Sequence, residues 1–173
     1  VHLLADGGAI TVGGSITANS TGTNNKGQAH KGGDIVIGRD EETGVLARYT
    51  DVSGANLESK QGFVETSGEF LKSNGVQIKA GQWLLDPTDI TIVSADTAAA
   101  NTPKTTASGT DTYQQTGATN TSEILNTDIS AALSNGTNVV IKTTNASATG
   151  NGDITVAANI SATSATAQDA TLT

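Results

Sequence analysis

The chain has 173 residues, and its 17 acidic against 9 basic side chains give a formal net charge of −8. Such a charge argues against binding nucleic acid or inserting into an anionic membrane through long-range attraction. No apolar run approaches the ~20 residues that span a bilayer, and cysteine is absent, which excludes disulfides and thiolate metal sites.

Large apolar side chains are scarce but clustered. Leu, Ile, Val and Phe make up 35 of the 173 residues, close to the level at which composition begins to indicate disorder. They nevertheless gather in short β-branched runs such as "DIVI" and "DITIV", separated by Gly, Asn, Ser and Thr. This pattern predicts an ordered all-β protein.

Two similar segments lie near the two ends of the chain: "GAITVGGSITANS" at Gly8–Ser20 and "GDITVAANISATS" at Gly152–Ser164. Each joins an Ile-Thr-Val strand to a second short strand centred on Ile16 or Ile160, which indicates a recurring unit. Further strands are expected, in chain order, within residues 32–38, 43–49, 61–68, 74–81, 88–94 and 136–143.

Strands this short, with small residues between them, suit a β-solenoid better than a sandwich. We expect one domain over residues 1–173, with coils over residues 1–93. Residues 94–120 are rich in Thr, Ala and Asn without apolar periodicity, which predicts a surface excursion. Residues 121–173 are expected to hold a short helix and then further coils.

The expected helix lies in "TSEILNTDISAALSNG", where Leu125, Ile129 and either Ala132 or Leu133 recur at helical spacing. Ser122 offers an N-cap, and Asn135 followed by Gly136 offers a stop. The alternative for this segment is another strand.

The stretch "GQWLLDPTDITI" holds the only tryptophan, Trp83. Alternation places Trp83 and Leu85 on one face, so Trp83 is expected to be buried, although a lone Trp beside acids also suits a sugar-binding or catalytic cleft. Asp86 before Pro87 predicts a turn with hydrogen bonds to the Asp86 side chain.

Candidates for catalysis are weak. The acids of "RDEET" at residues 39–43 predict a solvated turn, because no apolar neighbours separate their pKa values. Glu65 and Glu69 would serve a polysaccharide-acting enzyme only together with a nearby base. The two histidines have no neighbour at metal-ligand spacing. We therefore expect no catalytic residues, no metal and no cofactor.

The run Gly62–Ile92, "GFVETSGEFLKSNGVQIKAGQWLLDPTDITI", resembles the two-partner-secreted exoproteins of Gram-negative bacteria. This family includes the filamentous haemagglutinins and the high-molecular-weight adhesins. The resemblance implies a right-handed parallel β-helix, a non-catalytic adhesin on the bacterial surface, and virulence-related attachment to host cells, matrix or other bacteria. It also implies an outer-membrane partner pore that secretes the full-length protein.

The same resemblance makes Asn-X-Ser/Thr triplets candidate glycosylation sites, because some high-molecular-weight adhesins carry hexoses on such asparagines. The candidates are Asn120, Asn135 and Asn145, with Asn19 and Asn159 as weaker ones. The partner would be an unidentified host-cell receptor, glycan or matrix protein. Two alternatives remain open: a structural spacer without a ligand, and a polysaccharide-acting β-helix enzyme.

Overall fold

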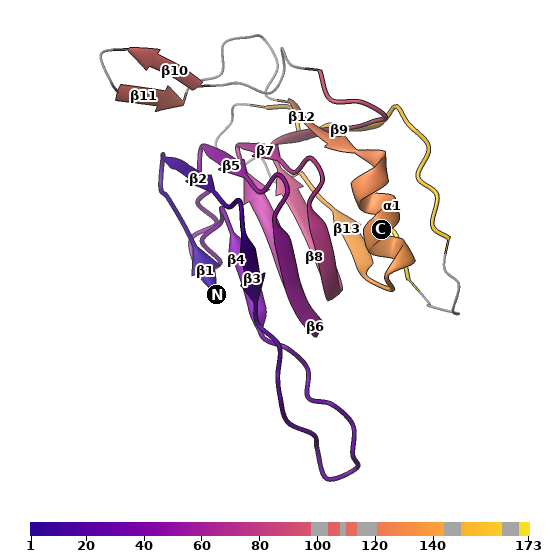
Figure 1. Ribbon diagram of the computed structural model, residues 1–173. Helices are drawn as coiled ribbons and strands as arrows, with labels where there is room; N and C mark the ends of the chain where they lie inside the picture. Colours follow the sequence, from indigo (N-terminus) through magenta and orange to yellow (C-terminus); the bar gives the residue numbers. More distant parts are fainter. Residues whose placement is uncertain (98–103, 108–109, 114–120, 144–149, 164–169) are drawn as a thin grey trace.

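The computed structural model describes residues 1–97, 104–107, 110–113, 121–143, 150–163 and 170–173. Strands dominate these residues, and one short helix, α1, accompanies them (Figure 1). The elements are β1 (His2–Leu3), β2 (Ala9–Thr11), β3 (Ser15–Thr17), β4 (Asp34–Ile37), β5 (Tyr49–Asp51), β6 (Asn56–Gly68), β7 (Phe70–Lys72), β8 (Gln77–Pro87), β9 (Asp89–Val93), β10 (Lys104–Ala107), β11 (Thr110–Tyr113), β12 (Thr121–Leu125), α1 (Asn126–Ser134), β13 (Asn138–Ile141) and β14 (Ile154–Val156).

Parallel pairing organises the strands into three sheets. The largest runs β1-β4-β6-β8-β13, with β3 also on β6, and the other two run β2-β5-β7 and β12-β9-β14. The strands β10 and β11 pair antiparallel with each other. The expected all-β class is therefore confirmed, and the three parallel sheets stay separate without any of them closing on itself.

Apolar side chains from successive strands stack at the same register position. Ile35 pairs with Val64, and Val64 with Trp83. Val139 pairs with Trp83 from the other side. All four are fully buried. This ladder lets a small set of large side chains form a continuous core, because each one packs on an apolar side chain of the neighbouring strand.

Two strands, β6 with 13 residues and β8 with 11, are longer than the clusters in the sequence predicted. Each continues through a bend and pairs again beyond it. The bend lies between Ser59 and Phe63, where the register shifts and Gln61 adopts a φ of 56°. A side chain at Gly62 would meet the Ser59 hydroxyl at 1.9 Å, so only glycine fits there.

The segment after the excursion contains both elements that the sequence offered as alternatives. Residues 121–125 form β12 beside β9, and the helix begins only at Asn126. The expectation of Ser122 as N-cap is wrong, because Ser122 is a strand residue whose hydroxyl accepts the Leu71 N–H at 2.9 Å. The predicted stop is confirmed: α1 ends at Ser134, and Gly136 has a φ of 80°.

The two similar segments, Gly8–Ser20 and Gly152–Ser164, form different numbers of strands. Both expected strands of the first form, as β2 and β3. In the second, β14 forms but Ile160 lies outside any strand and packs half-buried against the core. Of the predicted excursion, residues 98–103, 108–109 and 114–120 lie outside the described residues.

Trp83→Ala should lower the free energy of unfolding by about 3–5 kcal/mol, because it removes the largest member of the buried ladder. Urea unfolding followed by circular dichroism measures this change. Trp83→Phe is the matched control, since it keeps most of the volume and should cost clearly less. Equal stability of Trp83→Ala and the wild type would contradict the burial.

Candidate functional site

Trp83 lies inside the core and not in a cleft. Its indole is fully buried, and its Nε1–H donates to the Thr66 hydroxyl at 3.0 Å. Thr66 is buried as well and sits on the neighbouring strand β6. The polar end of the indole is thus satisfied inside the protein, so Trp83 presents no surface on which a sugar ring could stack.

The prediction of a turn at Asp86 and Pro87 is wrong, because both residues belong to the strand β8. The strand β8 runs to Pro87, and the chain bends at Thr88 before β9. The Asp86 side chain is fully buried, and its Oδ2 accepts a hydrogen bond from an Arg39 guanidinium nitrogen at 3.0 Å. A buried carboxylate needs such a charged donor, and the sequence analysis did not name this partner.

Arg39 binds a second carboxylate at the same place. The same guanidinium nitrogen lies 3.4 Å from Glu65 Oε1, and the Ser67 hydroxyl donates to that oxygen at 2.8 Å. The Glu65 side chain is 4% exposed and that of Arg39 is 26% exposed. We call Arg39, Glu65 and Asp86 the arginine cluster. It joins the end of β4 to β6 and β8, three neighbouring strands of the largest sheet.

The arginine cluster brings acids and a base together, as a polysaccharide-acting enzyme would need. Its geometry suits the joining of strands, however, because both carboxylates are buried and bound by the one arginine. The other acid considered for such a role, Glu69, lies apart from Glu65. It faces Arg48 at 3.9 Å, in a hollow of about 280 Å³ that also includes Asp6.

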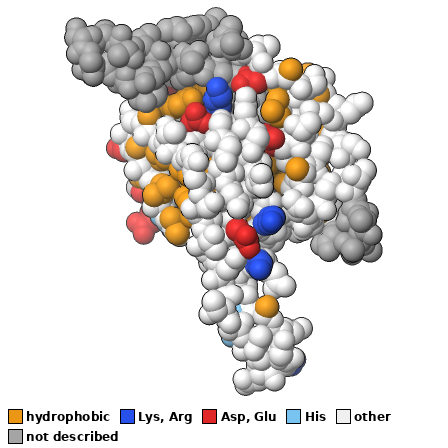
Figure 2. Space-filling view, viewed as in Figure 1, with side chains coloured by type: hydrophobic (Ala, Val, Ile, Leu, Met, Phe, Trp, Pro, Cys, Tyr) orange, Lys and Arg blue, Asp and Glu red, His pale blue; other side chains and the backbone are white. Residues whose placement is uncertain are grey.

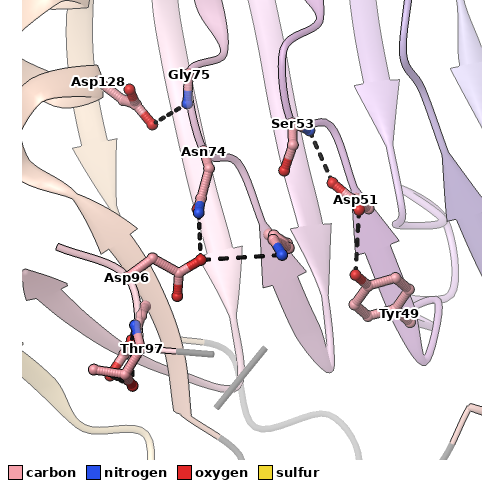
Figure 3. A network of polar contacts seen from close by, with 10 residues as sticks. Tyr49, Asp51, Ser53, Asn74, Gly75, Asp96, Thr97 and Asp128 are labelled. Carbon is pink, nitrogen blue, oxygen red and sulfur yellow. Dashed lines mark hydrogen bonds and ion pairs between the residues drawn. The ribbon is translucent and has the colours of Figure 1, made fainter. Parts of the chain in front are cut away.

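A polar network ties the residues that follow β9 to the sheets (Figure 3). Asp96 accepts a hydrogen bond from Asn74 and lies 4.0 Å from the Lys72 ammonium. The next residue, Thr97, donates its backbone N–H to Glu123 on β12 at 2.8 Å. These contacts fix the point at which the chain leaves β9.

Asp128 belongs to the same region and anchors α1. Its carboxylate accepts the Gly75 N–H of the β7–β8 turn at 3.1 Å (Figure 3). The residue is only 7% exposed, and this burial raises the pKa of the Asp128 carboxyl to about 6, while the hydrogen bond from Gly75 opposes the rise.

The candidate glycosylation sites differ in accessibility. Asn120 and Asn145 lie outside the described residues. Asn135 is exposed at the end of α1. The third residue of its triplet, Thr137, is buried, and the Thr137 hydroxyl accepts the Ala80 N–H at 3.1 Å. Asn19 uses both ends of its amide within the fold. Asn159 is exposed, and so is Ser161, the third residue of the same triplet.

No protein-family model, curated protein or solved structure matches this chain. Among the described residues, no helix is both long and apolar enough to cross a membrane. The same residues bring together no group of three or more His, Asp or Glu side chains that could hold a metal ion.

Arg39→Ala should lower the free energy of unfolding by about 3–5 kcal/mol, because it leaves two buried carboxylates without their cation. Thermal and urea unfolding measure the loss. The matched control is Arg48→Ala, which removes a more exposed pair and should cost no more than about 1 kcal/mol. Similar losses in the two variants would show that the arginine cluster is not a buried, tightly bound group.

Asp128→Asn should stabilise the protein at pH 7.5 and lose this advantage at pH 4.5. Because the carboxyl pKa of about 6 in the folded protein lies above its ordinary value of 3.8, the native state binds the Asp128 proton more tightly than the unfolded chain does. The contribution of Asp128 to the free energy of unfolding therefore falls by about 2 kcal/mol as the pH rises from 4.5 to 7.5. Urea unfolding of both proteins at the two pH values tests this, and a pH-independent difference would contradict it.

Proposed function

We propose that this chain is a segment of a secreted bacterial surface adhesin, built as a right-handed parallel β-helix. It is non-catalytic and contributes to attachment to host cells, extracellular matrix or other bacteria. Two independent lines support the proposal: the resemblance of Gly62–Ile92 to two-partner-secreted exoproteins, and the parallel arrangement of the sheets.

The order of the strands along the chain supports the β-helix of this proposal. The chain passes from β4 to β5 and on to the first half of β6, then from the second half of β6 to β7 and on to the first half of β8. The strands of each round lie parallel to and in register with those of the round before. Figure 1 shows the neighbouring strands β4, β6 and β8. A coiled path of this kind is how solenoid proteins stack successive turns.

The single observation that carries the proposal is the buried ladder that contains Trp83. The stretch around Trp83 is also the most specific part of the family resemblance. One residue thus connects the family pattern to a register that a β-helix requires. In the full-length protein, a partner pore in the outer membrane would export the segment to the cell surface.

Binding of the purified chain to cells tests the adhesin role. Fluorescently labelled protein is incubated with epithelial cells and with matrix-coated plates, and a scrambled chain of the same composition serves as control. We expect saturable binding that unlabelled protein displaces. Binding no greater than that of the scrambled chain would contradict direct contact.

A structural spacer is the second candidate, favoured by the small polar side chains that β2 and β3 expose, which are Thr11, Ser15 and Thr17. A spacer needs length and rigidity and makes no contact of its own. It predicts that the parent protein adheres equally well after deletion of residues 94–120, whereas a contact role for the excursion predicts a loss.

A further inference from the structure

A narrow projection leaves the body between β3 and β4. Figure 1 shows this part of the chain extending well below the sheets, and Figure 2 shows it as a separate arm of the surface. Residues 20–31, which we call the basic hairpin, are all exposed. No strand or site is predicted for this segment from the sequence, because the segment lacks the apolar periodicity that marks a strand.

The basic hairpin has an ordered tip. Thr23 and Ala29 form an antiparallel bridge across it. The Asn24 side-chain oxygen accepts the backbone N–H groups of Lys26 and Gln28 at 2.9 and 3.0 Å, and its amide nitrogen donates to the Gln28 side chain at 3.0 Å. A loop held by its own hydrogen bonds loses less entropy when it binds a ligand.

Both ends of the basic hairpin are fixed to β6. Asn19 donates to the Glu58 carboxylate at 2.7 Å and accepts the Lys60 N–H at 2.8 Å. On the returning side, the Gly32 N–H donates to the Lys60 carbonyl at 2.8 Å. The hairpin is therefore anchored to the largest sheet at both ends.

The charge of this region is opposite in sign to that of the chain. No Asp or Glu occurs from residue 7 to residue 33, although the whole chain has 17 of them. Lys26 and Lys31 lie within the basic hairpin, and neither takes part in an ion pair among the described residues. The exposed His30 imidazole adds a further hydrogen-bonding group.

A hollow of about 480 Å³ opens on the basic hairpin, lined by Thr23, Asn24, Asn25, Lys26, Gln28 and His30. The hollow is wide open to solvent, as a site on a long polymer can be. Its lining offers an ammonium group, amides and a hydroxyl, which suit the acid groups and hydroxyls of charged sugars. Residues 20–31 contain no aromatic residue and no aliphatic side chain larger than Ala29, so they offer nothing that would insert into a lipid bilayer.

We propose that the basic hairpin is a binding site for anionic polysaccharide, with Lys26 and Lys31 facing sulfate or carboxylate groups of the sugar. The inference rests on the proposed adhesin role, to which it adds the contact surface and the ligand class. Projection from the body matters here, because charges more than about 8 Å apart are largely screened at physiological salt. The hairpin can therefore attract an anion that the acidic body would repel.

The test uses the whole chain and four named probes: immobilised heparin, polysialic acid, neutral dextran, and vesicles containing phosphatidylserine. We expect binding to heparin or polysialic acid that NaCl weakens, and none to dextran. The double variant Lys26→Gln/Lys31→Gln should bind at least tenfold more weakly. The matched control Lys79→Gln/Lys142→Gln removes two exposed lysines elsewhere, with the same change in net charge, and should stay within twofold of the wild type.

Equal losses in the two double variants would overturn the inference, because binding would then follow net charge and not the hairpin. Tighter binding to the vesicles than to either acidic polysaccharide would also overturn it. Circular dichroism and thermal unfolding verify that all variants fold.

The cell-binding assay on the same variants separates this inference from the proposed function. Cell binding that survives Lys26→Gln/Lys31→Gln would overturn the hairpin as the contact surface and leave the adhesin role standing. Hairpin-dependent heparin binding without any binding to cells would support the site and contradict direct cell attachment.

Discussion

Parallel pairing at one fixed register is the constraint on which the rest of this structure depends. Side chains alternate between the two faces of a strand, so a slip of β6 by one residue would turn Val64 out of the core and break its stack with Ile35 and Trp83. In the native register these three are fully buried. A chain with few large apolar residues can form an ordered core in this way, because each member of the ladder is in contact with the next.

The register also explains the residues that interrupt the apolar pattern. Gly62 lies where β6 bends, and its missing side chain leaves room for the Ser59 hydroxyl and the Gly33 carbonyl. Across the same strands, Arg39 neutralises Glu65 and Asp86, which stacking has brought to one place from positions 26 and 47 residues away along the chain. The glycine permits the bend, and the arginine cluster holds the stacked strands at one end of the sheet.

The sequence allowed the all-β class, the first strand pair, the end of the helix and the burial of Trp83 to be predicted, because each depends on local alternation or on capping residues. It did not allow the arginine cluster to be predicted, since the partners of Asp86 become its neighbours only through connections of differing length between the strands. The role of Ser122 is also hidden in the sequence. Local spacing predicts a helix cap there, but the Ser122 hydroxyl accepts the Leu71 N–H of a strand distant in sequence. The basic hairpin had a signal, the acid-free run of residues 7–33, which apolar periodicity does not detect.

Disulfide trapping tests the parallel register most directly, because the chain has no cysteine of its own. Asn56 on β6 pairs in register with Gln77 on β8, and paired Cα atoms of neighbouring strands lie about 5 Å apart, within disulfide range. The account predicts that Asn56→Cys/Gln77→Cys oxidises readily within one chain, whereas Asn56→Cys/Lys79→Cys, offset by two residues to about 8 Å, does not. Equal crosslinking of both pairs, or preference for the offset pair, would contradict the register.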